Sequence, residues 1–315
     1  MRTIHVAFLS ALVVAIGTGA SPAAEPAARV EIVDDAFKAV ADPGAEVRQI
    51  ATDLKFTEGP TWYAAGKCLL FSDIPADRIY KWTEQGGLAV WREPSHQSNG
   101  NTTDNQGRLV TCEHATRRVT RTAADGTVEV LCDSYKGKPL NSPNDVAVRR
   151  DGTIWFTDPP YGLKGRKQEQ PACYVFRLDP GAKEPVAVAD DFTRPNGIAF
   201  SPDQTHLYVA NSDGKASHVR RFRVNDDKTL AGGEVFCKIR PGAPDGIRCD
   251  SGGRLYASVG DGVQVFSPAG KLIGKIRTPQ AAANCAFGGQ DGKTFCITAR
   301  KTLWAVRLKV AGTGQ

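Results

Sequence analysis

Three kinds of sequence pattern are missing from this chain of 315 residues. No long stretch shows a helical period of apolar residues, which argues against an α-helical or α/β fold. None of the eight cysteines lies in a C-x-x-C pair or at zinc-binding spacing, so the sequence offers no cysteine-based metal site. The Lys and Arg residues are scattered rather than gathered in a tract, which argues against nucleic acid as a partner despite the net charge of +6.

Long apolar runs are also rare, and the one near the N-terminus has the features of a secretory signal. Arg2 and His5 precede an apolar segment at 6–16, and small residues follow it. A membrane anchor is the less favoured alternative, because the run is shorter than the ~20 residues of a spanning helix. We therefore expect residues 1–23 to be a cleaved signal peptide. The mature chain should have no membrane span and should be periplasmic or secreted.

An exported destination would permit disulfides, which draws attention to the cysteines. Most of them lie in apolar, strand-like stretches and are interpreted as small buried hydrophobic residues. One pair is a candidate for a cross-strand disulfide. If a hairpin turns about Gln290 and Asp291, Cys285 and Cys296 would face each other across it.

Repetition is the main feature of the remaining chain. Six similar segments each open with a polar residue that carries a side-chain oxygen, and the openings are spaced 39 to 52 residues apart. Such a period is typical of repeat architectures, which bring equivalent positions to equivalent places in space. The six openings are Glu58, Asn101, Asn144, Asn196, Asp245 and Asn284.

Each opening leads into a similar series of short β-rich segments. A few apolar residues are followed by a turn containing Gly, Asp or Asn and then by a strand, such as 154–157 or 207–210. A third strand follows in every unit and a fourth in most of them. Six units of four strands predict an all-β fold, a six-bladed β-propeller over residues 45–312, preceded by an arm at 24–44. The last unit lacks a clear fourth strand, so segment 46–50 is expected to complete it and close the ring.

The openings should meet at one mouth of the central channel. Glu58 and Asp245 would contribute carboxylates, and Asn144 and Asn196 would contribute amide oxygens. This oxygen-only set suits Ca²⁺ or Mg²⁺, and Mn²⁺ less specifically. A cation would also relieve the repulsion between the two carboxylates. The competing interpretation is that each residue caps a turn or bonds a neighbouring blade, but six openings in register favour a shared central metal site.

A second layer of polar residues is expected around the same mouth, because the second strand of each unit returns to it. The candidates are His114, Arg117, Asp158 and Tyr161. A single histidine on a loop is as often a surface residue, and Asp158 with the two prolines after it could simply shape a rigid loop. Both alternatives stay open at this point.

Five motifs, taken in order, closely resemble the gluconolactonase / regucalcin (senescence marker protein) / luciferin-regenerating enzyme family. The resemblance extends from about residue 47 to about residue 308, and the motifs lie at 56–62, 142–146, 156–162, 194–203 and 244–247. It implies one central divalent cation held by Glu58, Asn196 and Asp245. Asn144 matches a fourth ligand found in relatives similar to diisopropylfluorophosphatase. Ca²⁺ is the expected ion, with Mg²⁺, Mn²⁺ or Zn²⁺ as alternatives.

The resemblance also implies an enzyme that opens sugar lactones. The cation would polarise the lactone carbonyl, and Asp245 would act as ligand and general base beside Glu58. Asn101 and His114 would bind substrate hydroxyls, and Arg117 would lend positive charge to the developing oxyanion. Regucalcin-like members carry Arg two residues before the position of Asn101. Asn99 stands there in this chain, which favours the bacterial gluconolactonase branch.

Two other functions are compatible with the same residues. One is the hydrolysis of an organophosphate or of another lactone at this site. The other is non-enzymatic, a calcium-stabilised propeller that binds protein or glycan partners, because propellers host many functions. An enzyme with a small lactone substrate is favoured, because all four ligand candidates are present: Glu58, Asn144, Asn196 and Asp245.

Overall fold

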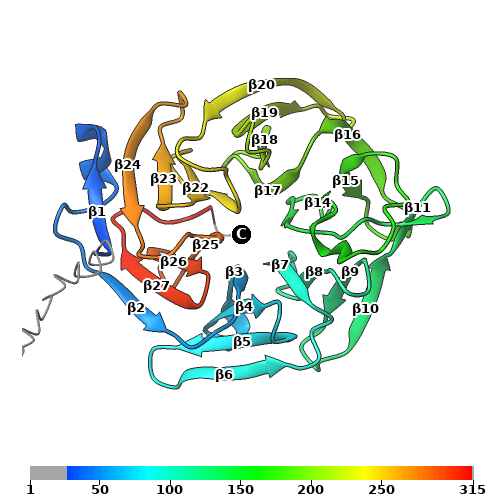
Figure 1. Ribbon diagram of the computed structural model, residues 1–315, viewed down its shortest axis with the longest axis horizontal. Coiled ribbons are helices and arrows are strands. Elements are labelled where there is room, and N and C mark those ends of the chain that lie inside the picture. Colours follow the sequence, from blue (N-terminus) through cyan, green and yellow to red (C-terminus); the bar gives the residue numbers. More distant parts are fainter. Residues whose placement is uncertain (1–26, 314–315) are drawn as a thin grey trace, which may run out of the picture.

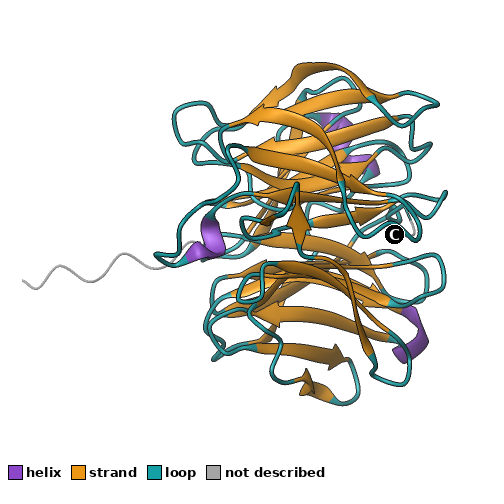
Figure 2. Cartoon of the chain, turned by 90° about the vertical axis from the view of Figure 1, so that its right-hand side faces the viewer, coloured by secondary structure: helices purple, strands orange, loops and turns teal. Residues whose placement is uncertain are grey.

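The computed structural model describes residues 27–313. The expected signal peptide, residues 1–23, lies outside the described residues. The described chain is a ring of six antiparallel sheets around a central channel (Figure 1). Seen from the side, the strands of each sheet run across the thickness of the ring (Figure 2). The predicted six-bladed β-propeller is therefore confirmed.

Each blade runs outward from an innermost strand that borders the channel. Blade one is β3 (Thr57–Tyr63), β4 (Cys68–Asp73), β5 (Arg78–Thr83) and β6 (Gly87–Arg92), and blade two is β7 (Ser98–Thr103), β8 (Leu109–Glu113), β9 (Arg118–Thr122) and β10 (Val128–Cys132). Blade three is β13 (Val146–Val148), β14 (Ile154–Asp158), β15 (Cys173–Leu178) and β16 (Val186–Phe192), and blade four is β17 (Pro195–Phe200), β18 (His206–Asn211), β19 (His218–Val224) and β20 (Leu230–Lys238).

The last two blades each take in a segment from the N-terminal part of the chain. Blade five is β21 (Ile247–Cys249), β22 (Leu255–Val259), β23 (Gly262–Phe266) and β24 (Leu272–Arg277). Blade six is β25 (Asn284–Gly288), β26 (Thr294–Ala299) and β27 (Thr302–Arg307), completed by β2 (Val47–Ala51). Val47 of β2 lies opposite Val306 of β27, so the N-terminal segment closes the ring as expected.

The segment expected to be an arm adds a fifth strand to blade five. β1 (Arg29–Ile32) pairs with β24, and the 3₁₀ helix η1 (Asp35–Ala39) follows it. Phe37 of η1 is fully buried against Gly274, where any larger residue would collide with the aromatic ring. One phenylalanine thus anchors this segment to the outer edge of the blade.

The other small elements lie in loops between strands. They are the 3₁₀ helices η2 (Ala64–Gly66) and η3 (Tyr161–Leu163), and the two-stranded hairpin of β11 (Ser134–Tyr135) and β12 (Lys138–Pro139). Across residues 27–313, no helix is long and apolar enough to cross a membrane.

The apolar core lies between neighbouring blades rather than at the centre of the ring. Trp155 of blade three meets Phe200 of blade four edge to face, with ring centroids 5.6 Å apart. Tyr256 of blade five packs in the same way against Phe287 of blade six, at 5.1 Å. Such contacts bury large aromatic surfaces and leave the channel free for polar groups.

The hairpin of β25 and β26 corrects the expected pairing of two cysteines. Cys285 lies opposite Ile297, and Cys296 lies opposite Ala286. Successive side chains on a strand point to opposite faces, so this offset of one residue sends the two thiols to different sides of the sheet. All eight cysteines are free thiols.

Neighbouring innermost strands approach so closely that only glycine fits at several positions. At Gly197 a side chain would collide with the main chain of Asp245 and Ile247 on the next blade. We expect Gly197→Ala to lower the free energy of unfolding, measured in urea, by about 2 kcal/mol, because the neighbouring strand must shift. Gly214→Ala is the matched control, since an added Cβ there meets nothing within 4 Å. Equal stability of the two variants would contradict this packing argument.

Candidate active site

A cavity of about 420 Å³ opens at one mouth of the channel, where the innermost strands begin. The structure brings six of the predicted site residues into its wall: Glu58, His114, Asn144, Tyr161, Asn196 and Asp245. The remaining lining residues are Phe56, Ile74, Pro75, Asn99, Lys164, Ser212, Ala243 and Pro244. The cavity wall therefore combines side chains that carry oxygen ligands with apolar side chains.

Main-chain hydrogen bonds between blades fix the positions of the opening residues. In each bond, the residue after one opening donates its N–H to the carbonyl oxygen of the next opening. The three bonds run from Gly100 to Asn144 at 2.8 Å, from Gly197 to Asp245 at 3.1 Å and from Gly246 to Ala283 at 2.8 Å. These bonds hold the backbone of Asn144 and Asp245, whose side chains line the cavity at the channel mouth.

This bonding pattern corrects the opening assigned to blade two. Asn99, followed by Gly100, lines the cavity, whereas Asn101 does not. The Asn101 side chain is fully buried and donates to the carbonyl oxygens of Gly59 and Asn99. A β-bulge between Ser98 and Asn101 causes the shift, because an extra residue moves the strand register. The signal available in the sequence was the polar–Gly pair, which blade two shares with Glu58-Gly59 and Asn196-Gly197.

The opening of blade six also shifts, in this case by one residue. Ala283 occupies the equivalent position, and the next residue, Asn284, supports blade one. The Asn284 amide donates to Oε2 of Glu58 at 3.1 Å, and the Gly59 N–H donates to the same oxygen at 2.8 Å. These two donors orient the Glu58 carboxylate without closing the channel mouth.

The two carboxylates of the cavity carry an electrostatic cost. Burial, and then the proximity of Asp245, raise the pKa of Glu58 well above its ordinary value. Burial also raises the pKa of Asp245 to about 7, although the amide of Asn196 acts in the opposite direction. Two carboxyl groups in one buried place cannot both ionise freely without a positive partner.

A buried ion pair beside the cavity was not anticipated from the sequence. Asp145 of blade three accepts from Nη1 of Arg248 of blade five at 3.0 Å, and the carboxylate is almost fully buried. The pair therefore spans the channel between non-adjacent blades. Asp145 stands next to Asn144, and its negative charge raises the pKa values of both Glu58 and Asp245.

His114 and Tyr161 come from adjacent blades and form one wall of the cavity. His114 is 4% exposed, and its Nε2 lies 3.2 Å from the Asn99 amide nitrogen. Burial lowers the pKa of His114 to about 4, with smaller contributions from Lys164 and Arg166. The imidazole is therefore neutral at physiological pH, with one donor and one acceptor nitrogen, and Nε2 pairs with the Asn99 amide.

The depressed pKa of His114 predicts an acid sensitivity of the fold. Between pH 6.5 and about 4 the unfolded chain binds a proton that the folded imidazole does not, so stability falls as the pH is lowered. The imidazole should account for a loss of about 3 kcal/mol across that range. Urea unfolding of chelated protein at pH 7 and pH 4.5 should show a smaller loss for His114→Gln than for the wild type. His206→Gln, outside the cavity, should behave like the wild type, and an unchanged loss in His114→Gln would contradict the assignment.

Two predicted substrate-binding residues support loops instead of lining the cavity. Arg117 donates through Nε to the carbonyl oxygen of Asn141 at 3.1 Å and pairs through Nη1 with Glu169 at 3.2 Å. Asp158 is fully buried and accepts from the Asn141 N–H at 2.7 Å. The structure therefore does not bring Arg117 or Asp158 into the cavity wall where contact with substrate was expected, and both side chains contact the 139–142 segment instead.

Comparison with known proteins places this arrangement in a family. The model described as "SMP-30/Gluconolactonase/LRE-like region" matches residues 56–301. The chain belongs to the SMP-30/gluconolactonase/LRE-like family. A gluconolactonase from Zymomonas mobilis is 34% identical over 302 residues, which cover 87% of this chain and 84% of that protein. The resemblance inferred from the motifs is thereby confirmed, and the chain is a member of a family of lactone hydrolases.

Solved structures of family members share the propeller. A gluconolactonase from Xanthomonas campestris is 38% identical, with a TM-score of 0.84 over 90% of this chain and 98% of that chain. A calcium-binding regucalcin from Agrobacterium tumefaciens is 21% identical, with a TM-score of 0.72 over 85% of this chain and 95% of that chain. The second similarity concerns the fold alone.

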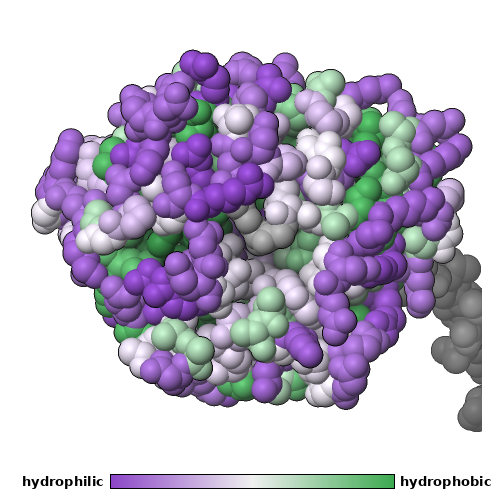
Figure 3. All heavy atoms as spheres, turned by 180° about the vertical axis from the view of Figure 1, so that it is seen from behind, coloured by the Kyte–Doolittle hydropathy of each residue, from purple (hydrophilic) through white to green (hydrophobic). Residues whose placement is uncertain are grey.

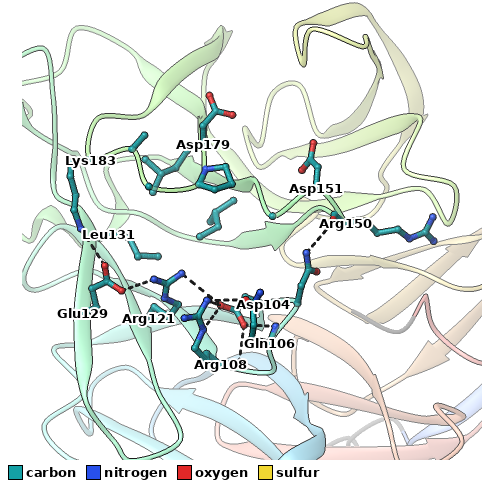
Figure 4. Close-up of a pocket in the computed structure, with 17 residues that line it drawn as sticks. Asp104, Gln106, Arg108, Arg121, Glu129, Leu131, Arg150, Asp151, Asp179 and Lys183 are labelled. Carbon is teal, nitrogen blue, oxygen red and sulfur yellow. Dashed lines mark hydrogen bonds and ion pairs between the residues drawn. The ribbon is translucent and has the colours of Figure 1, made fainter.

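Another cavity of this family member, of about 340 Å³, lies between blades two and three (Figure 4). Its charged groups largely neutralise one another. Nη2 of Arg108 lies 2.7 Å from Asp104, and Nη2 of Arg121 lies 2.6 Å from Glu129.

Figure 3 shows the face of the ring opposite to that seen in Figure 1, and hydrophilic residues cover most of it. Within residues 27–313 no salt bridge joins Glu58 or Asp245 to a cationic side chain, so the channel-mouth cavity is the candidate active site.

Proposed function

We propose that this family member hydrolyses sugar lactones with the help of one divalent cation. The cation would be held by Glu58, Asn144, Asn196 and Asp245. The observation that carries the proposal is the convergence of two carboxylates and two amides from four blades on the wall of one cavity. Family membership supplies the reaction class.

The donor set fits a hard divalent cation. The main-chain N–H groups of Asn144 and Asp245 donate to Thr157 and Ser258 at 2.8 and 2.9 Å, which holds both residues while their side chains face the cavity. Burial first, and neighbouring carboxylates second, raise the pKa values of Glu58 and Asp245, and a 2+ ion would offset both costs. The regucalcin that shares this fold is calcium-binding, so Ca²⁺ is the first ion to test, followed by Mg²⁺, Mn²⁺ and Zn²⁺.

The residues of the cavity would divide the reaction between them. When bound, the cation supplies a Lewis acid that polarises the lactone carbonyl. The Asp245 carboxylate would remove a proton from the attacking water, whose oxygen bonds to the carbonyl carbon. The ester C–O bond then breaks, and the ring oxygen leaves as a hydroxyl group after protonation. The product is an open hydroxy acid, which releases one proton near neutral pH.

Substrate hydroxyls would be bound by the part of the wall that blade two contributes. Neutral His114 and the Asn99 amide offer both donor and acceptor atoms at one place. Phe56, Ile74 and Pro75 also line the cavity and would exclude water from the reacting bond. Asn99 takes the role that the sequence analysis gave to Asn101.

A pH-stat assay on glucono-1,5-lactone tests the proposed function. Purified protein with Ca²⁺ should release protons well above the spontaneous rate, and chelated protein should not. A panel of other sugar lactones and an organophosphate ester would separate the substrate classes. No acceleration on any lactone with Ca²⁺, Mg²⁺, Mn²⁺ or Zn²⁺ would refute the proposal.

We also propose export of the chain, on the basis of the apolar segment at residues 6–16. The enzyme would then act on lactones formed by sugar oxidation outside the cytoplasm. Fractionation of cells that express the full chain, followed by N-terminal sequencing, tests this point. A cytoplasmic protein with an intact Met1 would contradict it.

A further inference from the structure

The side chain of Arg166 joins two loops that line the cavity. Nη2 donates to the carbonyl oxygen of His114 at 2.7 Å, and Nη1 donates to that of Ala115 at the same distance. The same guanidinium donates back to its own loop, to the carbonyl oxygens of Gly162 at 2.8 Å and Leu163 at 3.0 Å. Four carbonyl groups from blades two and three are thus held by one planar fork, whose geometry suits such bridging.

A second contact binds the same two loops on the side of the cavity. The His114 ring lies directly against Gly162, where any added Cβ would collide with Cβ, Cγ and Nδ1 of the histidine. Tyr161 precedes this glycine and faces the cavity together with His114. The contact between the His114 ring and Gly162 therefore ties the position of His114 to that of the loop that carries Tyr161.

We propose that Arg166 is a positioning residue that makes the His114 loop and the Tyr161 loop a single rigid wall for the substrate. Arg166 does not line the cavity and does not contact the carboxylates at Glu58 and Asp245. Its influence should therefore fall on substrate binding and leave the groups that carry out the reaction in place. The kinetic part of this inference rests on the proposed lactonase function, whereas the structural part does not.

Kinetics of Arg166→Gln test the role in binding. Loss of interactions that are equal in ground state and transition state raises KM and spares kcat, so KM should rise about tenfold and kcat should stay within about threefold. Arg166→Lys keeps the charge but cannot bridge four carbonyls, so it should not restore KM. Gly162→Ala pushes against His114 from the other side and should also raise KM. Lys167→Gln, an equal change of charge one residue along, is the matched control.

Hydrogen–deuterium exchange tests the joint itself, without any need for activity. In Arg166→Gln the amides of segments 113–117 and 160–166 should exchange faster together, whereas Lys167→Gln should leave both unchanged. Faster exchange in 160–166 alone, or a wild-type KM in Arg166→Gln, would overturn the proposal. A protein without lactonase activity that shows the coupled exchange would refute the proposed function and leave the joint standing.

Discussion

Asp245→Asn is expected to lower kcat for lactone hydrolysis by a factor of about 10³ or more, because the variant lacks both the general base and one anionic ligand. The fold should remain intact. Asp245 is buried near Glu58, and its ionisation is already disfavoured, so a neutral amide removes a repulsion. The thermal midpoint of the chelated variant should equal or exceed that of the chelated wild type. Steady-state kinetics and differential scanning calorimetry measure the two effects.

Asp213→Asn is the matched control for this substitution. Asp213 lies in the loop after β18, outside the cavity, and caps its own turn by accepting from the Lys215 N–H at 3.0 Å. Its kcat should stay within about twofold of the wild type, since the residue touches neither ligand nor substrate. Glu58→Gln should resemble Asp245→Asn. Near-normal turnover in either cavity variant would contradict the assigned roles.

Removal of the cation should produce the second large effect, which links activity to stability. A ligand that binds only the folded chain raises the free energy of unfolding by about 2.7 kcal/mol at a concentration one hundred times its Kd. We therefore expect chelation to abolish turnover and to lower the thermal midpoint. Addition of Ca²⁺ should restore both. Activity assays and thermal scans on the same sample, with and without chelator, measure this linkage.

The carboxylate variants provide the control for this linkage. In Asp245→Asn and Glu58→Gln the thermal midpoint should respond little to Ca²⁺, because each variant lacks one of the two anionic ligands. A midpoint that rises with Ca²⁺ equally in all three proteins would place the ion elsewhere. Full activity of chelated wild-type protein would show that the reaction needs no cation.

The ring could be predicted from the sequence because the same pattern of turns and strands recurs in all six units. Turn residues recur in every unit and a polar residue stands at or next to every opening, so an error in one unit does not disturb the others. Closure by segment 46–50 followed from the missing strand of the last unit. β1 could not be foreseen in the same way, because it adds a fifth strand to a complete blade and is anchored by the packing of Phe37 against a distant glycine.

Individual site residues were harder to predict, because the register of strand pairing decides which side chains reach the cavity. A bulge in β7 places Asn99 rather than Asn101 at the cavity. An offset of one residue in the β25–β26 hairpin keeps Cys285 and Cys296 from facing each other. Arg117 stands three residues after His114, which lines the cavity. Its guanidinium nevertheless donates to the carbonyl groups of a neighbouring loop. Side-chain direction of this kind depends on partners far away along the chain, which the local pattern does not contain.

Calcium titration calorimetry on the chelated protein tests the central claim most directly. The wild-type chain should bind one Ca²⁺ ion, and Asp245→Asn and Glu58→Gln should bind it at least about a hundredfold more weakly, since each lacks an anionic ligand of a buried site. Asp213→Asn should bind it like the wild type. Unchanged binding in both cavity variants, or no binding by the wild type to any divalent cation, would contradict the account.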